Sequence, residues 1–174
     1  MKIIQAPLSR EDIMDLTAGE PVLVNGTVYT ARDAAHQRMA AVIEAGKTLP
    51  FDPQGQVIYY TGPSPAPPGR VVGSAGPTTS GRMDAYAPLL IERGLRVMIG
   101  KGERNQAVKE AMRKHGAVYL AAVGGAGAYL ARRIVSAAVV AYPELGPEAI
   151  YRLEVKEFPC IVAIDARGGD IYER

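Results

Sequence analysis

The second half of this sequence alternates short apolar runs with longer amphipathic segments, and this alternation restricts the folds open to the chain. Short apolar runs bounded by turn residues predict buried strands, whereas apolar residues at helical spacing predict helices. Gly94 and Gly116 each follow a helical segment, where a left-handed residue commonly ends a helix. The pattern predicts helices over 79–93, 103–115 and 126–134 and strands over 70–73, 95–99, 117–123 and 137–142. Strands that alternate with helices favour an α/β fold with a mixed, partly parallel sheet flanked by helices.

The first half adds a predicted hairpin. Asn25-Gly26 joins the β-rich runs 22–24 and 27–29, and Asn-Gly between such runs is a strong hairpin signal because both turn residues need a positive φ. The remaining predicted elements are a short helix after Ser9, a helix over 32–45, a strand over 56–61, a proline-rich loop over 62–69 and strands over 150–165 followed by a Gly168-Gly169 turn. No repeat and no long linker divides the chain, so we expect a single domain over 1–174.

Composition and charge argue against several classes of protein. The formal net charge is only +2 and no long basic run occurs, which argues against a nucleic-acid-binding protein. Glycines interrupt the longest apolar segment, 117–130, so no run approaches the ~20 residues of a membrane span. Cys160 is the only cysteine, which excludes an internal disulfide and fits a reducing compartment. We expect a cytoplasmic protein that binds neither nucleic acid nor membranes.

The segment VGSAGPTTSGRMD, residues 72–84, has the composition of an anion site. It follows a predicted strand and opens a predicted helix, where free backbone N–H groups favour negative charge. Thr78 and Thr79 add hydroxyl groups, and Arg82 adds a planar guanidinium that suits a carboxylate or a phosphate. The same residues also fit a plain capped helix, with Thr78 or Thr79 as the N-cap and Asp84 in the first turn. The residues alone leave these two interpretations open.

Two further cations stand at predicted element boundaries. Lys101 lies between two glycines at the end of an apolar strand, where ligands of open α/β sheets bind, although a solvated lysine in a tight turn fits equally well. Arg32 opens a helix, where a cation is unfavourable for the helix dipole, so a role in binding is worth considering. Asp33 and His36 share a face of that helix, either as part of the site or as a helix cap and a surface histidine.

These segments together resemble a known family. The motifs GPTTSGRMD (76–84), IGKG (99–102), ARDAAH (31–36) and FPCIVAID (158–165) are similar to those of the β subunit of iron–sulfur class I fumarate hydratase and of the related L(+)-tartrate dehydratase β subunit. The resemblance extends from about residue 8 to about residue 172. It implies a swivelling β/β/α domain, the unit that forms the C-terminal domain of single-chain class I fumarases.

The resemblance also implies a reversible hydro-lyase that adds water across fumarate to give malate. In this family a [4Fe–4S] cluster with one open iron takes part in catalysis and needs three cysteine ligands. With Cys160 alone, this chain is expected to bind no cluster and no other metal, and a partner α subunit is expected to hold the cluster. Cys160 itself is expected to be a small residue of the hydrophobic core. The isolated chain is expected to expose a partly apolar docking surface and to self-associate through it as a homodimer.

Residue roles carried over from the family fall on the cations already selected. Arg32, Arg82 and Lys101 match the substrate-binding cations, and Thr78 matches the threonine proposed as the catalytic base. Thr79 is expected to bind substrate, or to be the base if the turn is shifted by one residue. Asp33 and His36, in the matching motif, are expected to support the site. The expected ligand is a small dicarboxylate: fumarate or malate, with tartrate as the first alternative and a non-catalytic anion-binding or regulatory module as the second.

Overall fold

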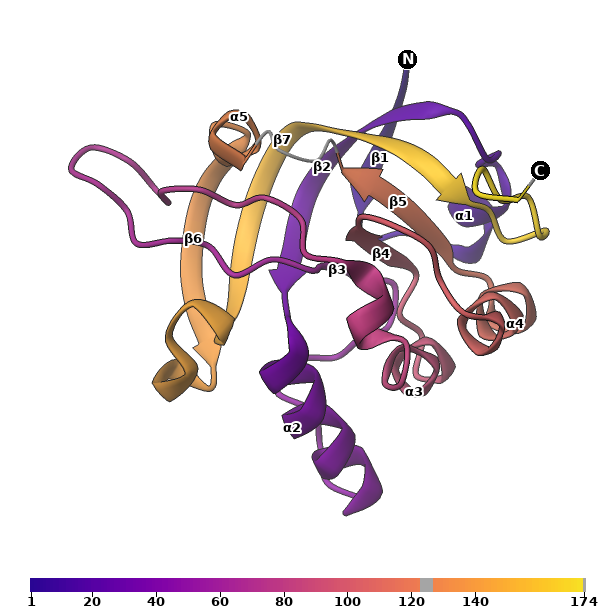
Figure 1. Ribbon diagram of the computed structural model, residues 1–174, viewed down its shortest axis with the longest axis horizontal. Helices are drawn as coiled ribbons and strands as arrows, with labels where there is room; N and C mark the ends of the chain where they lie inside the picture. The colour runs from indigo at the N-terminus through magenta and orange to yellow at the C-terminus, as the bar shows by residue number, and fades with distance from the viewer. Residues whose placement is uncertain (123–126, 174) are drawn as a thin grey trace.

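The computed structural model describes residues 1–122 and 127–173, and within these ranges seven strands form one mixed sheet (Figure 1). The strands are β1 (Lys2–Ala6), β2 (Pro21–Thr30), β3 (Val57–Tyr59), β4 (Val97–Gly100), β5 (Val118–Ala122), β6 (Ile134–Ala141) and β7 (Ile150–Ile164). The helices are α1 (Arg10–Met14), α2 (Asp33–Glu44), α3 (Ala87–Glu92), α4 (Gln106–His115) and α5 (Gly127–Ala131), with 3₁₀ turns η1 (Ser80–Met83) and η2 (Pro143–Glu148).

The sheet closes on itself. Strands β1 to β5 pair in parallel in the order β1-β2-β3-β4-β5, whereas β7 runs antiparallel to β5, β6 and β2. Because β7 pairs with both β5 and β2, the strands β2, β3, β4, β5 and β7 form a ring, to which β1 and β6 are added. The predicted α/β fold with a mixed, partly parallel sheet flanked by helices is confirmed.

Alternation along the strands produces two cores. Val57 and Tyr59 of β3 point into the ring, whereas Ile58 packs with Met98 of β4 beneath the helices. In Figure 1, α2, α3 and α4 lie on one side of the strands, and their buried residues, such as Met39, belong to the second core. Strand residues that alternate between two buried environments are apolar at nearly every position, which is why β3 and β4 read as continuous apolar runs.

The predicted hairpin at Asn25-Gly26 is wrong, because β2 runs straight through it. Gly26 does have a positive φ, 103°, as a hairpin turn would require. However, Gly26 lies in a β-bulge, because the register of β2 against β7 shifts between Val24 and Gly26. A side chain at Gly26 would also collide with β1, since its Cβ would lie 2.5 Å from the carbonyl oxygen of Ala6. Strand β1, which the sequence did not predict, therefore explains part of the need for this glycine.

The predicted strand over 70–73 is also absent from the part of the chain that the structure describes. Residues 62–74 instead form a long irregular excursion that passes β6 in Figure 1, with residues 69–72 near the start of β6. Its two arms are joined locally, because the Ser64 N–H donates to the Ser74 carbonyl and the Gly73 N–H donates to the Ser64 carbonyl. The arm over 62–69 contains four prolines, which lack the N–H groups needed to extend a ladder.

The helix predicted over 79–93 is divided into η1 and α3. Pro88 stands in the first turn of α3, where a proline is tolerated, but its ring would clash with the carbonyl of Asp84 if the helix continued upstream. Other predicted elements are confirmed with shifted ends. Val123 and Ala126, at the ends of a predicted strand and helix, lie outside the described residues. Among the residues that the structure describes, no helix has both the length and the apolarity to cross a bilayer.

Candidate functional site

The segment over 76–84 lies across the carboxyl ends of β3 and β4. The Thr78 N–H donates to the Tyr60 carbonyl at 2.7 Å, and the Ser80 N–H donates to the Lys101 carbonyl at 2.9 Å. Thr79 and Lys101 form an isolated parallel bridge. This segment, which we call the TTS loop, therefore continues the parallel pairing beyond the end of β4. Thr78 is half-buried, while Thr79 is exposed, so both hydroxyl-bearing residues stand at the rim of the sheet.

The predicted helix N-terminus under this loop is not present. The loop contains the four-residue turn η1, for which Thr79 is the N-cap without a side-chain capping bond. Asp84 ends this turn instead of opening it. The capped-helix interpretation is therefore wrong, and so is the argument from a helix dipole.

The structure brings two of the predicted cations together on one carboxylate. Arg82 holds the Oδ2 atom of Asp33 with both Nε and Nη2, each at 2.9 Å, and the Nε atom of Arg32 lies 3.9 Å from Oδ1 of the same residue. Arg32 is the N-cap of α2 and Arg82 belongs to η1, so the ion pairs join two distant segments. Lys101 is exposed, and its backbone lies beside the loop through the bridge to Thr79.

Several polar atoms in this region are buried without a hydrogen-bond partner among the described residues. They include Nε of Arg32, Oδ1 of Asp33 and Nε2 of His36. Buried polar atoms are nearly always paired. Here Nε of Arg32 and Oδ1 of Asp33 face each other at 3.9 Å, beyond hydrogen-bond distance, and atoms elsewhere in the described part of the chain, such as Oε1 of Gln56, are also without a partner. A residue larger than glycine at position 62 would crowd Arg32, since its Cβ would lie 3.2 Å from Cδ of Arg32.

His36 is fully buried, so its interpretation as a surface residue is wrong. Its Nδ1 atom lies 2.9 Å from the Arg32 carbonyl oxygen, and the ring packs edge-on against Tyr60. The pKa of His36 is lowered to about 4, mainly by burial and also by the nearby Arg104 charge. The ring is therefore neutral at pH 7, and because a carbonyl only accepts, Nδ1 carries the proton. This bond fixes the backbone of Arg32 at the start of α2.

A buried polar cluster that the sequence did not reveal lies beneath the loop. Arg104 is only 5% exposed and its Nε donates to Oδ1 of Asp84 at 2.7 Å. The Tyr119 hydroxyl lies 2.8 Å from both Oγ of Ser80 and the Gly102 carbonyl oxygen. Gly100 permits this arrangement, because a Cβ there would overlap Oγ of Ser80. Arg104 is not among the residues selected from the sequence, and Asp84 was predicted there only in the first turn of a helix.

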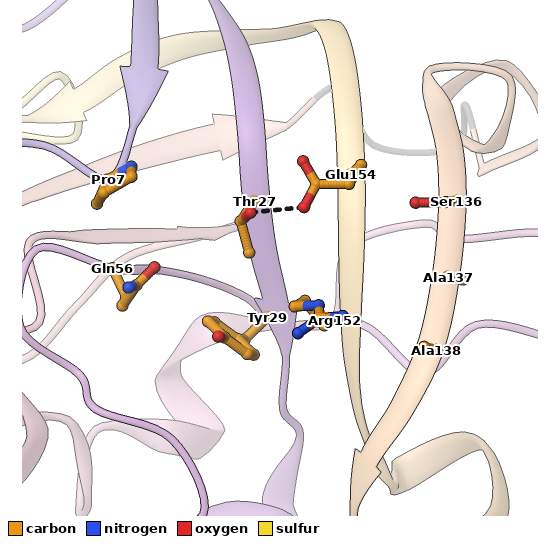
Figure 2. A pocket seen from close by; sticks show the side chains of 9 residues that line it. All are labelled: Pro7, Thr27, Tyr29, Gln56, Ser136, Ala137, Ala138, Arg152 and Glu154. Atoms are coloured by element: carbon orange, nitrogen blue, oxygen red, sulfur yellow. Dashed lines mark hydrogen bonds between the residues drawn. The ribbon is translucent and has the colours of Figure 1, made fainter.

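The groove shown in Figure 2 lies elsewhere, on the outer face of the sheet. It has a volume of about 360 Å³ and passes over β2 and β7 between Pro7 and β6. Its floor includes the Thr27 hydroxyl, which donates to Glu154 at 2.6 Å. The full lining is Pro7, Thr27, Tyr29, Gln56, Ser136, Ala137, Ala138, Arg152 and Glu154. None of the residues selected from the sequence lines this groove, so we place the candidate site at the loop.

The residues of this chain do not fit an iron–sulfur cluster. Such a cluster is held by several cysteine thiolates, and the chain has one cysteine. Cys160 is buried in β7 as part of the core inside the ring, and burial raises the pKa of its thiol. Among the described residues, no group of three or more His, Cys, Asp or Glu side chains could hold a metal ion.

Comparison with known proteins places these segments in a wider context. Residues 2–174 match the family described as "Fumarase C-terminus". The whole chain is 42% identical to part of the "Fumarate hydratase class I, anaerobic" of Escherichia coli K12, and 95% of it is 39% identical to part of "Fumarate hydratase 2" of Leishmania major. It spans about a third of the length of these relatives: 31% and 29%. It is also 38% identical, over 95% of its length, to 88% of the "Putative L(+)-tartrate dehydratase subunit beta" of Methanocaldococcus jannaschii.

Proposed function

The chain belongs to the fumarase C-terminus family, and we propose that it forms the carboxylate-binding part of a hydro-lyase that interconverts fumarate and (S)-malate. The observation that carries this proposal is the meeting of Arg32 and Arg82 on Asp33, beside the TTS loop and Lys101. Three cations from three segments at one rim suit a ligand with two carboxylates. The relatives named fumarate hydratase give the reaction class.

The cations suit the chemistry of this reaction. Hydration adds a hydroxyl to one alkene carbon and a proton to the other, and dehydration reverses both steps. Removal of the proton next to a carboxylate pushes its electron pair onto the carboxylate oxygens. Fixed cations at those oxygens stabilise that charge as it forms, and they need no reorganisation during the reaction. Arg32, Arg82 and Lys101 are proposed to supply this stabilisation.

Thr78 is proposed to receive or deliver the proton. A hydroxyl group is a weak base on its own, so Thr78 requires a neighbouring group that stabilises its alkoxide or relays the proton. The half-buried position of Thr78 and its backbone bond to Tyr60 support a fixed role, whereas Thr79 is exposed and faces Lys101 across the bridge. We therefore assign substrate binding to Thr79. Thr78→Val should abolish turnover, and Thr79→Val should mainly raise KM; the reverse pattern would exchange the two roles.

The remaining parts of the reaction are assigned to a partner. We propose an α subunit that holds a [4Fe–4S] cluster and completes the site, because this chain has one buried cysteine and spans about a third of the fumarate hydratases. The relative named "subunit beta" supports a two-chain arrangement. The same relative favours L(+)-tartrate as an alternative substrate, since the chain covers 88% of it. Fumarate, malate and tartrate should therefore be assayed side by side.

The proposal is tested by producing the chain with an α-type partner under anaerobic conditions and following malate–fumarate interconversion. Arg82→Ala and Lys101→Ala should each lower kcat/KM by at least about 100-fold, because each removes a cation at a developing charge. Lys114→Ala, an exposed cation on α4, is the matched control and should be neutral. Unchanged kcat/KM in both site variants would refute the assignment. Tight dicarboxylate binding by the isolated chain, without turnover in the complex, would favour a regulatory module.

A further inference from the structure

We propose that Arg104 is a positioning residue that fastens the TTS loop to residues 101–103, the Lys101 turn, and so fixes the spacing of the cations above it. The inference deepens the proposed function and relies on it for the identity of the site. Arg104 touches no candidate ligand position in the structure: its side chain is fully buried beneath the loop. Its effect would be exerted through Asp84 and through two tyrosine rings.

One carboxylate joins the two segments. Oδ1 of Asp84, at the end of η1, accepts from Nε of Arg104 at 2.7 Å, and Oδ2 accepts from the Asn105 backbone N–H at 2.8 Å. Both partners follow the Lys101 turn directly in sequence, whereas Asp84 comes two residues after Arg82. The Asp84 carboxylate is therefore a link between the segment that carries Arg82 and the segment that carries Lys101.

The remaining faces of the Arg104 guanidinium are held by aromatic rings. Its central carbon lies 5.2 Å from the ring centre of Tyr60 and 4.8 Å from that of Tyr119, and Nη2 donates to the Tyr60 hydroxyl at 3.1 Å. Tyr60 follows β3 and accepts the Thr78 N–H through its carbonyl. Tyr119 belongs to β5 and contacts Ser80 through its hydroxyl. The guanidinium thus joins the loop, the turn and two places on the sheet.

The link lies in a different electrostatic environment from the cations above it. The Asp84–Arg104 pair is buried, where screening by salt is weak, whereas Arg82 and Lys101 are exposed and their charges are screened. A lysine cannot replace Arg104, because an ammonium group lacks the planar fork that contacts Asp84 and Tyr60 simultaneously and the flat surface that packs on the rings.

The test is residue-resolved amide hydrogen exchange of the chain carrying Arg104→Lys, with Asp84→Asn as a second variant that removes the other half of the link. The Thr78 and Ser80 amides, which donate to Tyr60 and Lys101, should exchange at least about tenfold faster, whereas the amides of β4 keep their protection. Lys114→Met, on the exposed face of α4, is the control and should change neither set.

Activity provides the second readout. In the assembled enzyme, at a temperature well below the midpoint of thermal unfolding, Arg104→Lys should lower kcat/KM at least about tenfold while the fraction of folded protein stays unchanged. Unchanged exchange at Thr78 and Ser80 would overturn the inference, and so would equal acceleration at every amide, since that pattern reports a loss of global stability. A wild-type complex without hydratase activity would refute the proposed function instead, while the exchange result still decides whether Arg104 positions the loop.

Discussion

The buried histidine should make the stability of this protein depend on pH in a way that can be calculated. His36 is fully buried, bonds through Nδ1 to the Arg32 carbonyl, and packs against Tyr60 and Tyr86. Burial is the main cause that lowers the pKa of His36 from its ordinary value of 6.5 to about 4, and Arg104 adds to it, whereas Asp33 and the Arg32 carbonyl oppose it. In the unfolded chain the ring is solvated and takes up a proton near its ordinary pKa.

Whether acid raises or lowers the stability depends on which state, folded or unfolded, binds the proton at the higher pH. As the pH falls below 6.5, the unfolded state is protonated while the folded state is not, so acid favours unfolding. The stability that the fold gains by keeping His36 neutral is fully present above pH 6.5 and is lost as the pH falls toward 4. Each pKa unit corresponds to about 1.4 kcal/mol, so the interval from 6.5 to about 4 corresponds to a loss of about 3 kcal/mol. That is a large part of the 5–15 kcal/mol that typically stabilises a folded domain.

The assay compares urea unfolding of the wild type and His36→Phe at several pH values from about 7 to about 4.5. The phenylalanine ring keeps the packing against Tyr60 and Tyr86 but cannot be protonated. Acid also protonates carboxylates whose pKa is lowered in the fold, such as Asp12 and Glu144, so the difference between the two proteins isolates the histidine. The wild type should lose over 2 kcal/mol more than His36→Phe across this range.

His115→Gln, which removes the other histidine and keeps His36, is the matched control and should retain the extra acid loss. Parallel pH dependences for the wild type and His36→Phe would refute the reasoning, because they would mean that the buried ring is protonated as easily in the fold as in the unfolded chain. Such a result would also remove the argument that His36 donates from Nδ1 to fix Arg32.

Three further predictions concern single contacts. Gly100→Ala should lower the free energy of unfolding, measured by urea titration, by about 1–3 kcal/mol, because the added Cβ would overlap Oγ of Ser80. Gly81→Ala is the control: its Cβ would meet only an ordinary contact at 3.9 Å, so the free energy of unfolding should change by less than about 0.5 kcal/mol. Ser9→Ala should cost about 1 kcal/mol by thermal unfolding, since it removes the capping box of α1. Cys160 should react with a thiol reagent only after denaturation, because its thiol is buried and burial raises its pKa; Cys160→Ala should keep full activity in the complex.

Local signals in the sequence were sufficient for much of the fold. Apolar runs flanked by glycine gave β4 and β5, and the helical spacing between them gave α4, whose end at the left-handed Gly116 was predicted as well. The positions of Arg32 at the start of α2 and of Lys101 after β4 followed from the same signals. Each of these features was predictable because the residues that determine it lie close together in the sequence.

The errors arose where a distant segment decides the local conformation. Asn25-Gly26 requires a positive φ whether it forms a hairpin turn or a bulge, and only the pairing of β2 with β1 and β7 selects the bulge. Arg104 presents a similar problem. Its neighbours in sequence, Glu103 and Asn105, are exposed, and its burial depends on Asp84 and on two tyrosines, one just after β3 and one in β5. No window of local sequence contains that information.

The charges at the loop bear on the kind of ligand that the site can hold. Arg32, Arg82 and Lys101 bring three positive charges, Asp33 brings one negative charge, and the Asp84–Arg104 pair beneath them is neutral, as is His36 at pH 7. These residues of the proposed site sum to two positive charges, the number that a dicarboxylate neutralises, before counting the negative charge of Glu148, whose carboxylate accepts from the Ala34 N–H beside Asp33. Asp33 differs from an ordinary helix cap, because its carboxylate contacts Arg82 and lies beside Arg32, which come from two distant segments. The carboxylate thus keeps two guanidinium groups close together, and in the proposed site this closeness would let both contact one dicarboxylate.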